Sequence, residues 1–180
     1  MKLQLIVGSV REGRTAIKIA TWAKQYLDQL GYDQLDTEIV DLKVWDLPFF
    51  AGAHPPASGI YDQPKQQQWA NKIAEADAFL LISPEYNHGY TPVLKNALDY
   101  LGKEWQSKPV GFISYGSVQG ANSVNQLRQV CVTLGMIDSN AVVGIRDIFS
   151  RNKDDTFQGN EFDEKALKSS VEKLFRYSNR

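Results

Sequence analysis

The sequence predicts an α/β fold, a doubly wound five-stranded parallel sheet with helices on both faces. Two observations lead to this prediction. Short apolar runs alternate with segments of helical periodicity along the whole chain, and there are five such strand–helix units. A barrel built from these units needs eight of them, so an open sheet is favoured. The length of 180 residues suits one domain, which is expected to span residues 1–180.

The expected strands are apolar or alternating runs. The run from Ala78 to Ser83 is continuously apolar, as in a strand that is covered on both faces. The segment Glu38–Leu42 alternates between polar and apolar residues, which indicates a half-buried strand. The remaining expected strands are Leu3–Val7, Pro109–Tyr115 and Ile137–Ile145.

The expected helices carry apolar side chains at helical spacing. Thr91 and Pro92 begin one of them as N-cap and first helical residue, because threonine satisfies a free amide and proline lacks one. The first helix is expected to end at Gly31. Taken in order, the helical patterns span residues 17–30, 69–76, 94–101, 124–134 and 167–177.

The composition excludes several classes of protein. The 20 Lys and Arg residues face 21 Asp and Glu residues, and this net charge of −1 argues against a nucleic-acid-binding protein. The single cysteine, Cys131, excludes an intrachain disulfide and a cysteine-built zinc site, and no metal is expected. The longest apolar run, residues 78–82, is too short to span a bilayer. Arg11 and Glu12 come too early for a signal peptide, so a cytoplasmic protein is expected.

Residues 44–63 form one long irregular stretch that nevertheless carries Trp45, Phe49, Phe50 and Tyr61. Loops of this length are uncommon unless they are functional, and a plain linker would not carry these aromatic residues. We expect a wall of the ligand site or a subunit contact, with packing against the domain itself as the alternative.

Ligands of doubly wound sheets bind where the parallel strands end, and the first turn at that edge is Gly8–Thr15. It lacks the G-x-G-x-x-G spacing and comes within one residue of a P-loop, with Arg14 in place of the lysine. Glu12 would place a carboxylate in a cradle meant for several phosphates. A single phosphate group at a helix N-terminus is therefore favoured, and a polar turn with solvated arginines is the alternative. The candidate ligands are Ser9, Arg11, Arg14 and Thr15.

The second turn, Ser83–Pro92, follows the buried third strand. The rings of Tyr86 and Tyr90 can flank a flat ligand, and backbone amides around residues 87–89 can donate to the edge of such a ligand. The following helix directs its positive end toward this turn, where it would stabilise a planar ring that gains negative charge on reduction. A solvated loop histidine is the ordinary interpretation of His88, and a catalytic proton role is its alternative. The ordinary interpretation of Glu85 is a surface carboxylate.

The third turn, Ser114–Asn122, contains Gly116 and Gly120, which let a backbone approach a ligand closely. Tyr115 and Ser117 can touch a second edge of a ring. The alternative is a glycine-containing turn of the kind that any parallel sheet needs.

The first turn and the long motif Pro84–Tyr100 together resemble the NAD(P)H-dependent FMN reductase family, and the similarity runs from Met1 to about Val143. The resemblance implies a flavodoxin-like fold with strand order 2-1-3-4-5. Members are typically homodimers, some of which pair into tetramers, with the flavin near the subunit boundary. Many relatives carry Gly-Gly followed by an arginine in the third turn, where this chain has Gln119-Gly120-Ala121-Asn122.

Carried over by position, the resemblance implies three groups of FMN-binding residues. The phosphate would be held by Ser9, Arg11, Arg14, Thr15, Ala16 and Ile17. The isoalloxazine ring would be held by Pro84, Glu85, Tyr86, Asn87, His88 and Gly89. The site would be completed by Ser114, Tyr115 and Gly116. The flavin supplies the chemistry, so no side chain is required as a nucleophile or general base, and catalytic residues are left open.

The resemblance implies an oxidoreductase that uses NADH or NADPH. The reduced nicotinamide would pass hydride to bound FMN, and a quinone, a free flavin or an azo dye would then take the electrons from the same face. Two alternatives stay open. One is a flavodoxin-like FMN electron carrier that serves a protein partner, although such carriers are typically strongly acidic. The other is a P-loop-type nucleotide-binding enzyme.

Overall fold

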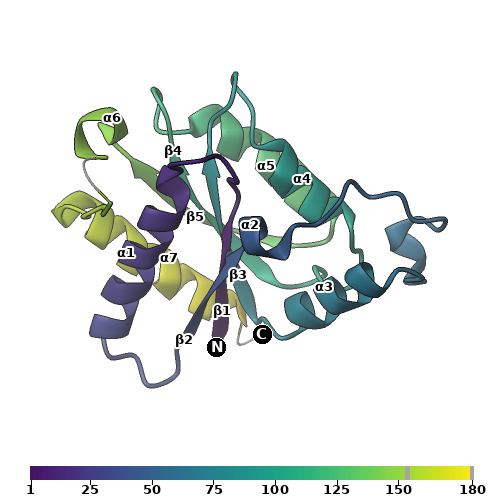
Figure 1. The fold of residues 1–180 in the computed structure, drawn as a ribbon. Coiled ribbons are helices and arrows are strands. Elements are labelled where there is room, and N and C mark those ends of the chain that lie inside the picture. The colour runs from purple at the N-terminus through teal and green to yellow at the C-terminus, as the bar shows by residue number, and fades with distance from the viewer. Residues whose placement is uncertain (153–154, 179–180) are drawn as a thin grey trace.

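The computed structural model describes residues 1–152 and 155–178. Its five parallel strands form one sheet in the order β2-β1-β3-β4-β5, so the predicted sheet and strand order are confirmed. The strands all end at the same edge, which is uppermost in Figure 1. Their bounds are β1 (Lys2–Val7), β2 (Asp36–Asp41), β3 (Ala78–Pro84), β4 (Pro109–Tyr115) and β5 (Ile137–Ile145).

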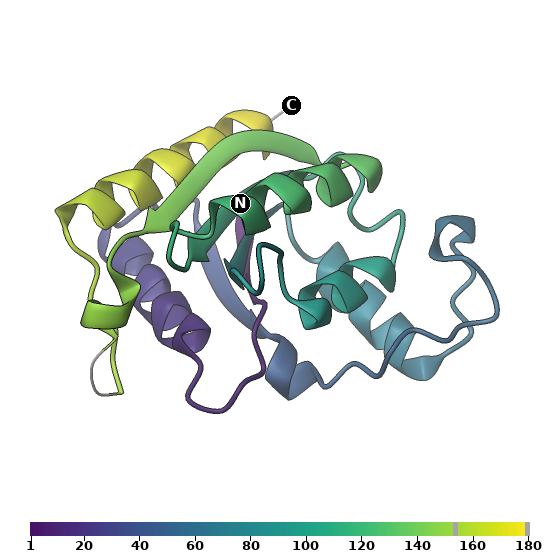
Figure 2. The ribbon, with the colours of Figure 1, turned by 90° about the horizontal axis from the view of Figure 1, so that it is seen from above.

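Helices cover both faces of the sheet, as Figure 2 shows from above. One face is covered by α1 (Thr15–Gln29) and α7 (Glu161–Ser178). The other is covered by α3 (Pro64–Ala74), α4 (Pro92–Asp99) and α5 (Ala121–Thr133). Three short helices, α2 (Leu42–Trp45), η1 (Pro56–Ser58) and α6 (Ile148–Arg151), lie in the connections. Within the described ranges, no helix has the length and apolar character that crossing a membrane requires.

The short helix α2 corrects the expected second strand at one residue. The alternating pattern placed Leu42 in the strand, but Leu42 begins α2 because the Asp41 carboxylate accepts a hydrogen bond from the Lys43 amide and caps the turn. The short helix α6 has no counterpart among the expected elements, since four residues carry too little periodicity to be recognised.

The start of α4 agrees with the prediction and also ties two loops together. Thr91 caps the helix by accepting from the Leu94 amide, and its hydroxyl donates to the Gly8 carbonyl at 2.6 Å. Gly8 itself lies close to β3, because a Cβ there would stand 2.8 Å from the Ile82 carbonyl oxygen. The first turn is thus fixed against both β3 and the start of α4.

The long stretch of residues 44–63 packs against its own domain. The Asn96 side chain on α4 bonds the backbone at Leu47, Pro48 and Phe50, and the Tyr100 hydroxyl donates to the Pro48 carbonyl at 2.6 Å. Packing against the domain does not exclude a functional role, because Leu47 and Phe49 also line a surface cleft described below.

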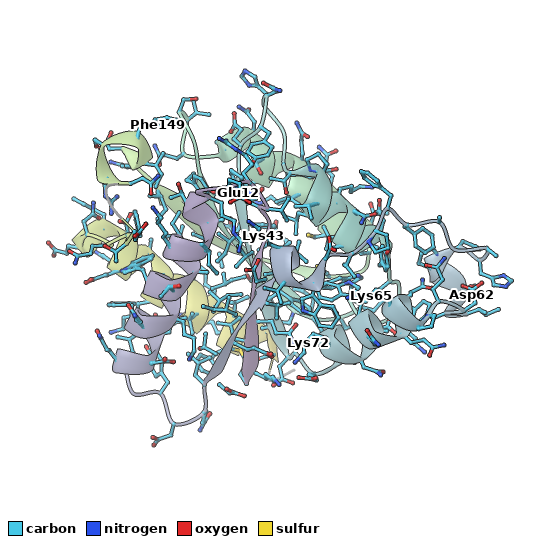
Figure 3. The ribbon with its side chains drawn as sticks, in the orientation of Figure 1. Glu12, Lys43, Asp62, Lys65, Lys72 and Phe149 are labelled. Atoms are coloured by element: carbon cyan, nitrogen blue, oxygen red, sulfur yellow. The ribbon has the colours of Figure 1, made fainter. Side chains whose placement is uncertain are left out.

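Glu75 takes part in an ion-pair network at the opposite edge of the sheet, near Lys72 in Figure 3. Hydrogen bonds from Lys2 and then Lys72 lower the pKa of Glu75 from an ordinary value of 4.5 to about 2. A carboxyl whose pKa is lowered by folding stabilises the native state above its unfolded pKa, and this contribution disappears as the pH falls through the folded pKa. We expect the unfolding free energy of Glu75→Gln to fall less steeply between pH 4.5 and 2 than that of the wild type. Urea titrations across this range measure both slopes, and identical slopes would contradict the prediction.

Candidate functional site

A cleft of about 380 Å³ crosses the carboxyl ends of the strands, and we call it the edge cleft. All three unusual turns contribute to its walls. The first turn supplies Ser9, Arg11, Arg14 and Thr15 among the predicted residues. The second and third turns supply Pro84, Glu85, Tyr86, Tyr115 and Gly116. Small-molecule sites commonly enclose about 300–1,000 Å³, so the edge cleft has the size of a ligand site.

The first turn offers an anion-binding position at the start of α1. Arg14 occupies the N-cap position without a side-chain capping bond, so the first amides of the helix are not satisfied by a cap side chain. Ala16 and Ile17 belong to this first helical turn rather than to the lining of the cleft. Arg11 is exposed, with its guanidinium 6.0 Å from the centre of the Tyr86 ring. Uncapped amides and a nearby cation favour a phosphate here.

Arg14 does not have the surroundings expected of a phosphate ligand. Its guanidinium donates to both Asp41 oxygens, at 2.6 and 2.5 Å, and to the Ser9 carbonyl at 2.7 Å. This pair is largely buried, with side chains 10% and 14% exposed. Arg14 therefore braces the turn against the end of β2, and Arg11 is the better candidate to meet an anion.

Glu12 also differs from the expectation. Glu12 lines the edge cleft, but its carboxylate is exposed and pairs with the Lys43 ammonium at 2.8 Å, and Figure 3 labels both side chains. The Lys43 ammonium therefore offsets the negative charge that Glu12 brings to the first turn. What disfavours a P-loop is Arg14, because the cation at the lysine position of that motif is engaged by Asp41.

The second turn contains a tight two-residue hairpin at its tip. Tyr86 and Gly89 exchange backbone hydrogen bonds of 2.8 and 2.9 Å, while Asn87 and His88 have φ values of 49° and 65°. These are the dihedral angles of a type I′ turn. The amides of Tyr86 and Gly89 are hydrogen-bonded to each other's carbonyls. The hairpin amides that remain available to the edge of a ligand are therefore those of Asn87 and His88.

The Glu85 carboxylate faces the protein rather than solvent. Only 7% of its side chain is exposed, and it accepts hydrogen bonds from Asn122 at the start of α5. The interpretation of Glu85 as a surface carboxylate is therefore wrong. The exposed His88 stands beside it, with 84% of its side chain accessible.

The third turn presents Tyr115 and Gly116 to the edge cleft. Burial raises the pKa of the Tyr115 hydroxyl far above its ordinary value, so this hydroxyl stays neutral at physiological pH. The Ser114 hydroxyl donates to the Gln119 carbonyl at 2.8 Å and closes the turn. Gly120 has a φ of 74°, and a Cβ at this position would lie 2.7 Å from Ser114 Cβ. Glycine at 120 therefore allows the backbone to pack closely against Ser114.

A fourth wall of the edge cleft was missed in the sequence analysis. Ile148, Phe149 and Asn152 reach the cleft from α6, after the end of β5. Phe149 is 81% exposed and stands at the top of the molecule in Figure 3. Phe149 follows closely after the last predicted strand, and an aromatic residue at that place in the sequence could have indicated this wall of the cleft.

A second, more apolar cleft of about 640 Å³ adjoins the first, and we call it the side cleft. The two clefts share Ser9, Arg11 and Tyr86. The side cleft is otherwise lined by residues of α2, the 44–63 stretch and α4, which include Leu42, Leu47, Phe49 and Val93. From the 44–63 stretch, Asp46, Leu47 and Phe49 line the side cleft. That this cleft is part of the ligand site stays a prediction.

The order of the strands defines the class of protein. Strand order reverses between β1 and β3, and the turns that follow these two strands both line the edge cleft. In open α/β sheets the ligand binds at such a switch point, outside the carboxyl ends of the strands. The fold and the site are those of a flavodoxin-like ligand-binding protein.

Comparison with known sequences identifies the family. Residues 1–149 match the family described as NADPH-dependent FMN reductase. The chain is 40% identical over 139 residues to an NAD(P)H-dependent FMN reductase of Schizosaccharomyces pombe, covering 75% of this chain and 68% of the relative. It is 32% identical over 145 residues to an NAD(P)H-dependent FMN reductase of Saccharomyces cerevisiae, covering 76% of each chain. The chain belongs to the NADPH-dependent FMN reductase family.

Solved structures agree with the fold. The NAD(P)H:acceptor oxidoreductase FerB of Paracoccus denitrificans superposes with a TM-score of 0.69 at 19% identity, covering 98% of both chains. An oxidised flavodoxin of Bacillus cereus superposes with a TM-score of 0.58 at 14% identity, covering 97% of this chain and 98% of its own. The predicted flavodoxin-like fold is confirmed.

Family membership makes this protein an oxidoreductase with FMN as its cofactor and NAD(P)H as its electron donor. The residues present fit the cofactor. Uncapped amides and the exposed Arg11 suit its phosphate, and the hairpin beside Tyr86 offers donors for the edge of a ring.

Proposed function

We propose that this oxidoreductase takes electrons from NAD(P)H and passes them to flat acceptors such as quinones, free flavins or azo compounds. The observation that supports the proposal is the edge cleft at the switch point of the sheet, which is lined by the first turn on one side and by Tyr86, Tyr115 and Gly116 on the other. Named relatives fit this range of acceptors. They include an FMN-dependent NADPH-azoreductase of Staphylococcus saprophyticus, 32% identical, and a probable NADPH:quinone oxidoreductase of rice, 31% identical.

The chain's residues would divide the work of holding the cofactor. The first turn, with Ser9, Arg11 and the amides of Thr15 and Ile17, would hold the phosphate end, and Arg14 would hold that turn in place through the Ser9 carbonyl. The Ala16 amide is bonded to Tyr115. The hairpin that follows Pro84 would bind the ring edge, and Tyr115 with Gly116 would form the opposite wall. When bound, FMN supplies the hydride and electron chemistry, so positioning and charge are the contribution of the protein.

The side cleft supports a place for the second substrate. It adjoins the edge cleft at Tyr86, and its apolar walls suit a flat ring. Phe49, which also lines the side cleft, is 83% exposed. The charged residues of the lining are Arg11, Asp46 and Lys43, and Lys43 is paired with Glu12. The nicotinamide and the acceptor would use this space in turn.

We also propose that the chain folds as one domain and forms a homodimer in the cytoplasm. Large apolar side chains stand exposed along the 44–63 stretch, at Val44, Phe49 and Ile60, which is typical of a surface that another chain covers. A donor of NAD(P)H type favours the interior of the cell. Light scattering of the purified protein measures the mass, and cell fractionation measures the location.

Phe149 is expected to cover part of the bound cofactor. Replacing Phe149 with alanine removes apolar contact with the cofactor. Because the ring would be only partly covered, the expected loss of binding free energy is about 1–2 kcal/mol, which raises the Kd for FMN by about 5- to 30-fold. Phe162→Ala is the matched control, because Phe162 is 75% exposed and lies in the first turn of α7, outside the lining of the edge cleft. Fluorescence titration of the apo-protein with FMN measures both variants. Equal affinities would exclude Phe149 from the site.

The experiment that tests the proposed function is steady-state oxidation of NAD(P)H by the FMN-loaded protein, with a quinone as the sole acceptor. Turnover is expected. A protein that binds FMN and shows no turnover would be an electron carrier instead, although its net charge of −1 differs from the strongly acidic charge typical of such carriers. Micromolar ATP affinity without flavin affinity would favour a nucleotide-binding enzyme.

A further inference from the structure

The hairpin at residues 86–89 needs support from outside itself. Both of its central residues, Asn87 and His88, have positive φ values, and the pair that most favours this turn is Asn-Gly rather than Asn-His. The left-handed region is sterically unfavourable for residues other than glycine, and asparagine tolerates it better than histidine's bulkier side chain does. Such a conformation persists only where the surrounding structure holds it in place.

The first two turns of α5 provide this support. The Asn122 amide and side chain donate to the two oxygens of Glu85, at 3.1 and 2.9 Å. The same Asn122 side chain lies 3.0 Å from His88 Nδ1. One turn further along, Gln126 Nε2 donates to the His88 carbonyl at 2.7 Å. Hydrogen bonds from one helix therefore hold both the base and the tip of the hairpin.

The fit between α5 and the hairpin is also close in space. A Cβ on Gly89 would stand 3.2 Å from Gln126 Oε1, so glycine lets the hairpin lie directly against the helix. Asn122 and Gln126 do not belong to the walls of the edge cleft or the side cleft, and of the hairpin itself only Tyr86 lines them. Any effect they have on a ligand must pass through the hairpin.

We propose that Asn122 and Gln126 are positioning residues for the flavin ring, and that they hold residues 86–89 in the conformation that binds its edge. This inference rests on the proposed placement of the ring against the hairpin. Without the two side chains, only part of the apo-protein population would present the amides of Asn87 and His88 correctly. Apparent affinity falls in proportion to the fraction of molecules that are competent to bind.

Gln126→Ala is the primary test, because Gln126 is exposed and its loss leaves the core untouched. Removing one neutral hydrogen bond is expected to raise the Kd for FMN by about 3- to 10-fold. The Kd for riboflavin should rise by the same factor, because the hairpin serves the ring and not the phosphate. Asn122→Ala removes more bonds and should have a larger effect in the same sense. The visible absorption of FMN bound to either variant should shift toward that of free flavin.

Two further variants separate positioning from general stability. Gln126→Lys keeps a donor within reach of the His88 carbonyl and is expected to restore the affinity for both flavins. Gln129→Ala is the matched control, since Gln129 lies on the same helix in a separate groove with Lys95 and Asp99, and it should bind like the wild type. Wild-type affinity of Gln126→Ala for both flavins, or a loss confined to FMN, would overturn the proposal.

A measurement on the wild type separates this inference from the proposed ring placement. Backbone amide NMR signals of Asn87 and His88 are expected to shift when FMN is added to the apo-protein. If they do not shift, the ring lies elsewhere and the proposed site is wrong. If they shift while Gln126→Ala binds both flavins like the wild type, the site stands and only the positioning role fails.

Discussion

Replacing Arg11 with alanine is expected to weaken FMN binding by about 1.5–3 kcal/mol, or roughly 10- to 150-fold in Kd. Arg11 is exposed beside Tyr86 in both clefts, and the other arginine of the turn is held by Asp41. A charge-assisted bond to phosphate is stronger than a neutral one, so losing it costs more than losing a single amide donor.

The effect of Arg11→Ala should depend on the phosphate. Riboflavin lacks the phosphate, so its affinity is expected to stay close to that for the wild type. Titration of apo-protein with both flavins measures the ratio directly, and Arg176→Ala on the exposed surface of α7 controls for a general loss of positive charge. Unchanged FMN affinity of Arg11→Ala would remove the first turn from the site.

Replacing Asp41 with alanine is expected to destabilise the protein by about 3 kcal/mol, since it leaves the Arg14 guanidinium largely buried without its counter-charge. The substitution also removes the cap of α2. Chemical denaturation measures the change. The exposed pair of Lys24 and Asp28 provides the comparison, because breaking it in Asp28→Ala should cost about 0.3–0.5 kcal/mol.

The Asp41 substitution is also expected to lower the affinity for FMN. Arg14 holds the Ser9 carbonyl, so freeing it loosens the turn that is proposed to bind phosphate, and FMN affinity should fall without direct contact. Replacing Arg14 and Asp41 together with apolar residues should cost less stability than the sum of the single changes. Strictly additive losses would show that the two side chains do not act as a pair.

Most of the strands and helices could be predicted from the sequence, because apolar runs and helix-capping residues are patterns of neighbouring residues. A strand such as β3 is apolar at nearly every position since both of its faces are covered, and this can be seen without knowing what covers it. The same holds for Thr91 and Pro92, whose capping chemistry acts within one turn of α4. The short helices α2 and α6 were not predicted. They depend on particular side chains, such as Asp41 at the start of α2 and the Arg151–Asp163 ion pair that ties the end of α6 to α7.

The candidate site could be located from the sequence but not resolved in detail. The positions of the three turns after parallel strands predicted one shared edge, and nine of the fifteen predicted residues line the edge cleft there. The other six, which are outside that lining, are Ala16, Ile17, Asn87, His88, Gly89 and Ser114. That these residues bind the cofactor stays a prediction. The roles of individual side chains needed partners from elsewhere. Glu85 faces Asn122 across 37 residues, and Phe149 reaches the cleft from beyond the last strand.

The sequence by itself determined the five-unit α/β architecture, the near-neutral charge and the pair of arginines in the first turn, because each is a property of neighbouring residues or of their sum. Only the tertiary structure decided which arginine is available to a ligand. Asp41 lies 27 residues from Arg14 along the chain, and parallel pairing of β2 with β1 brings its carboxylate to that guanidinium. The Asp41 carboxylate is largely buried and forms an ion pair with Arg14, so Arg11 is the arginine of this turn that remains exposed.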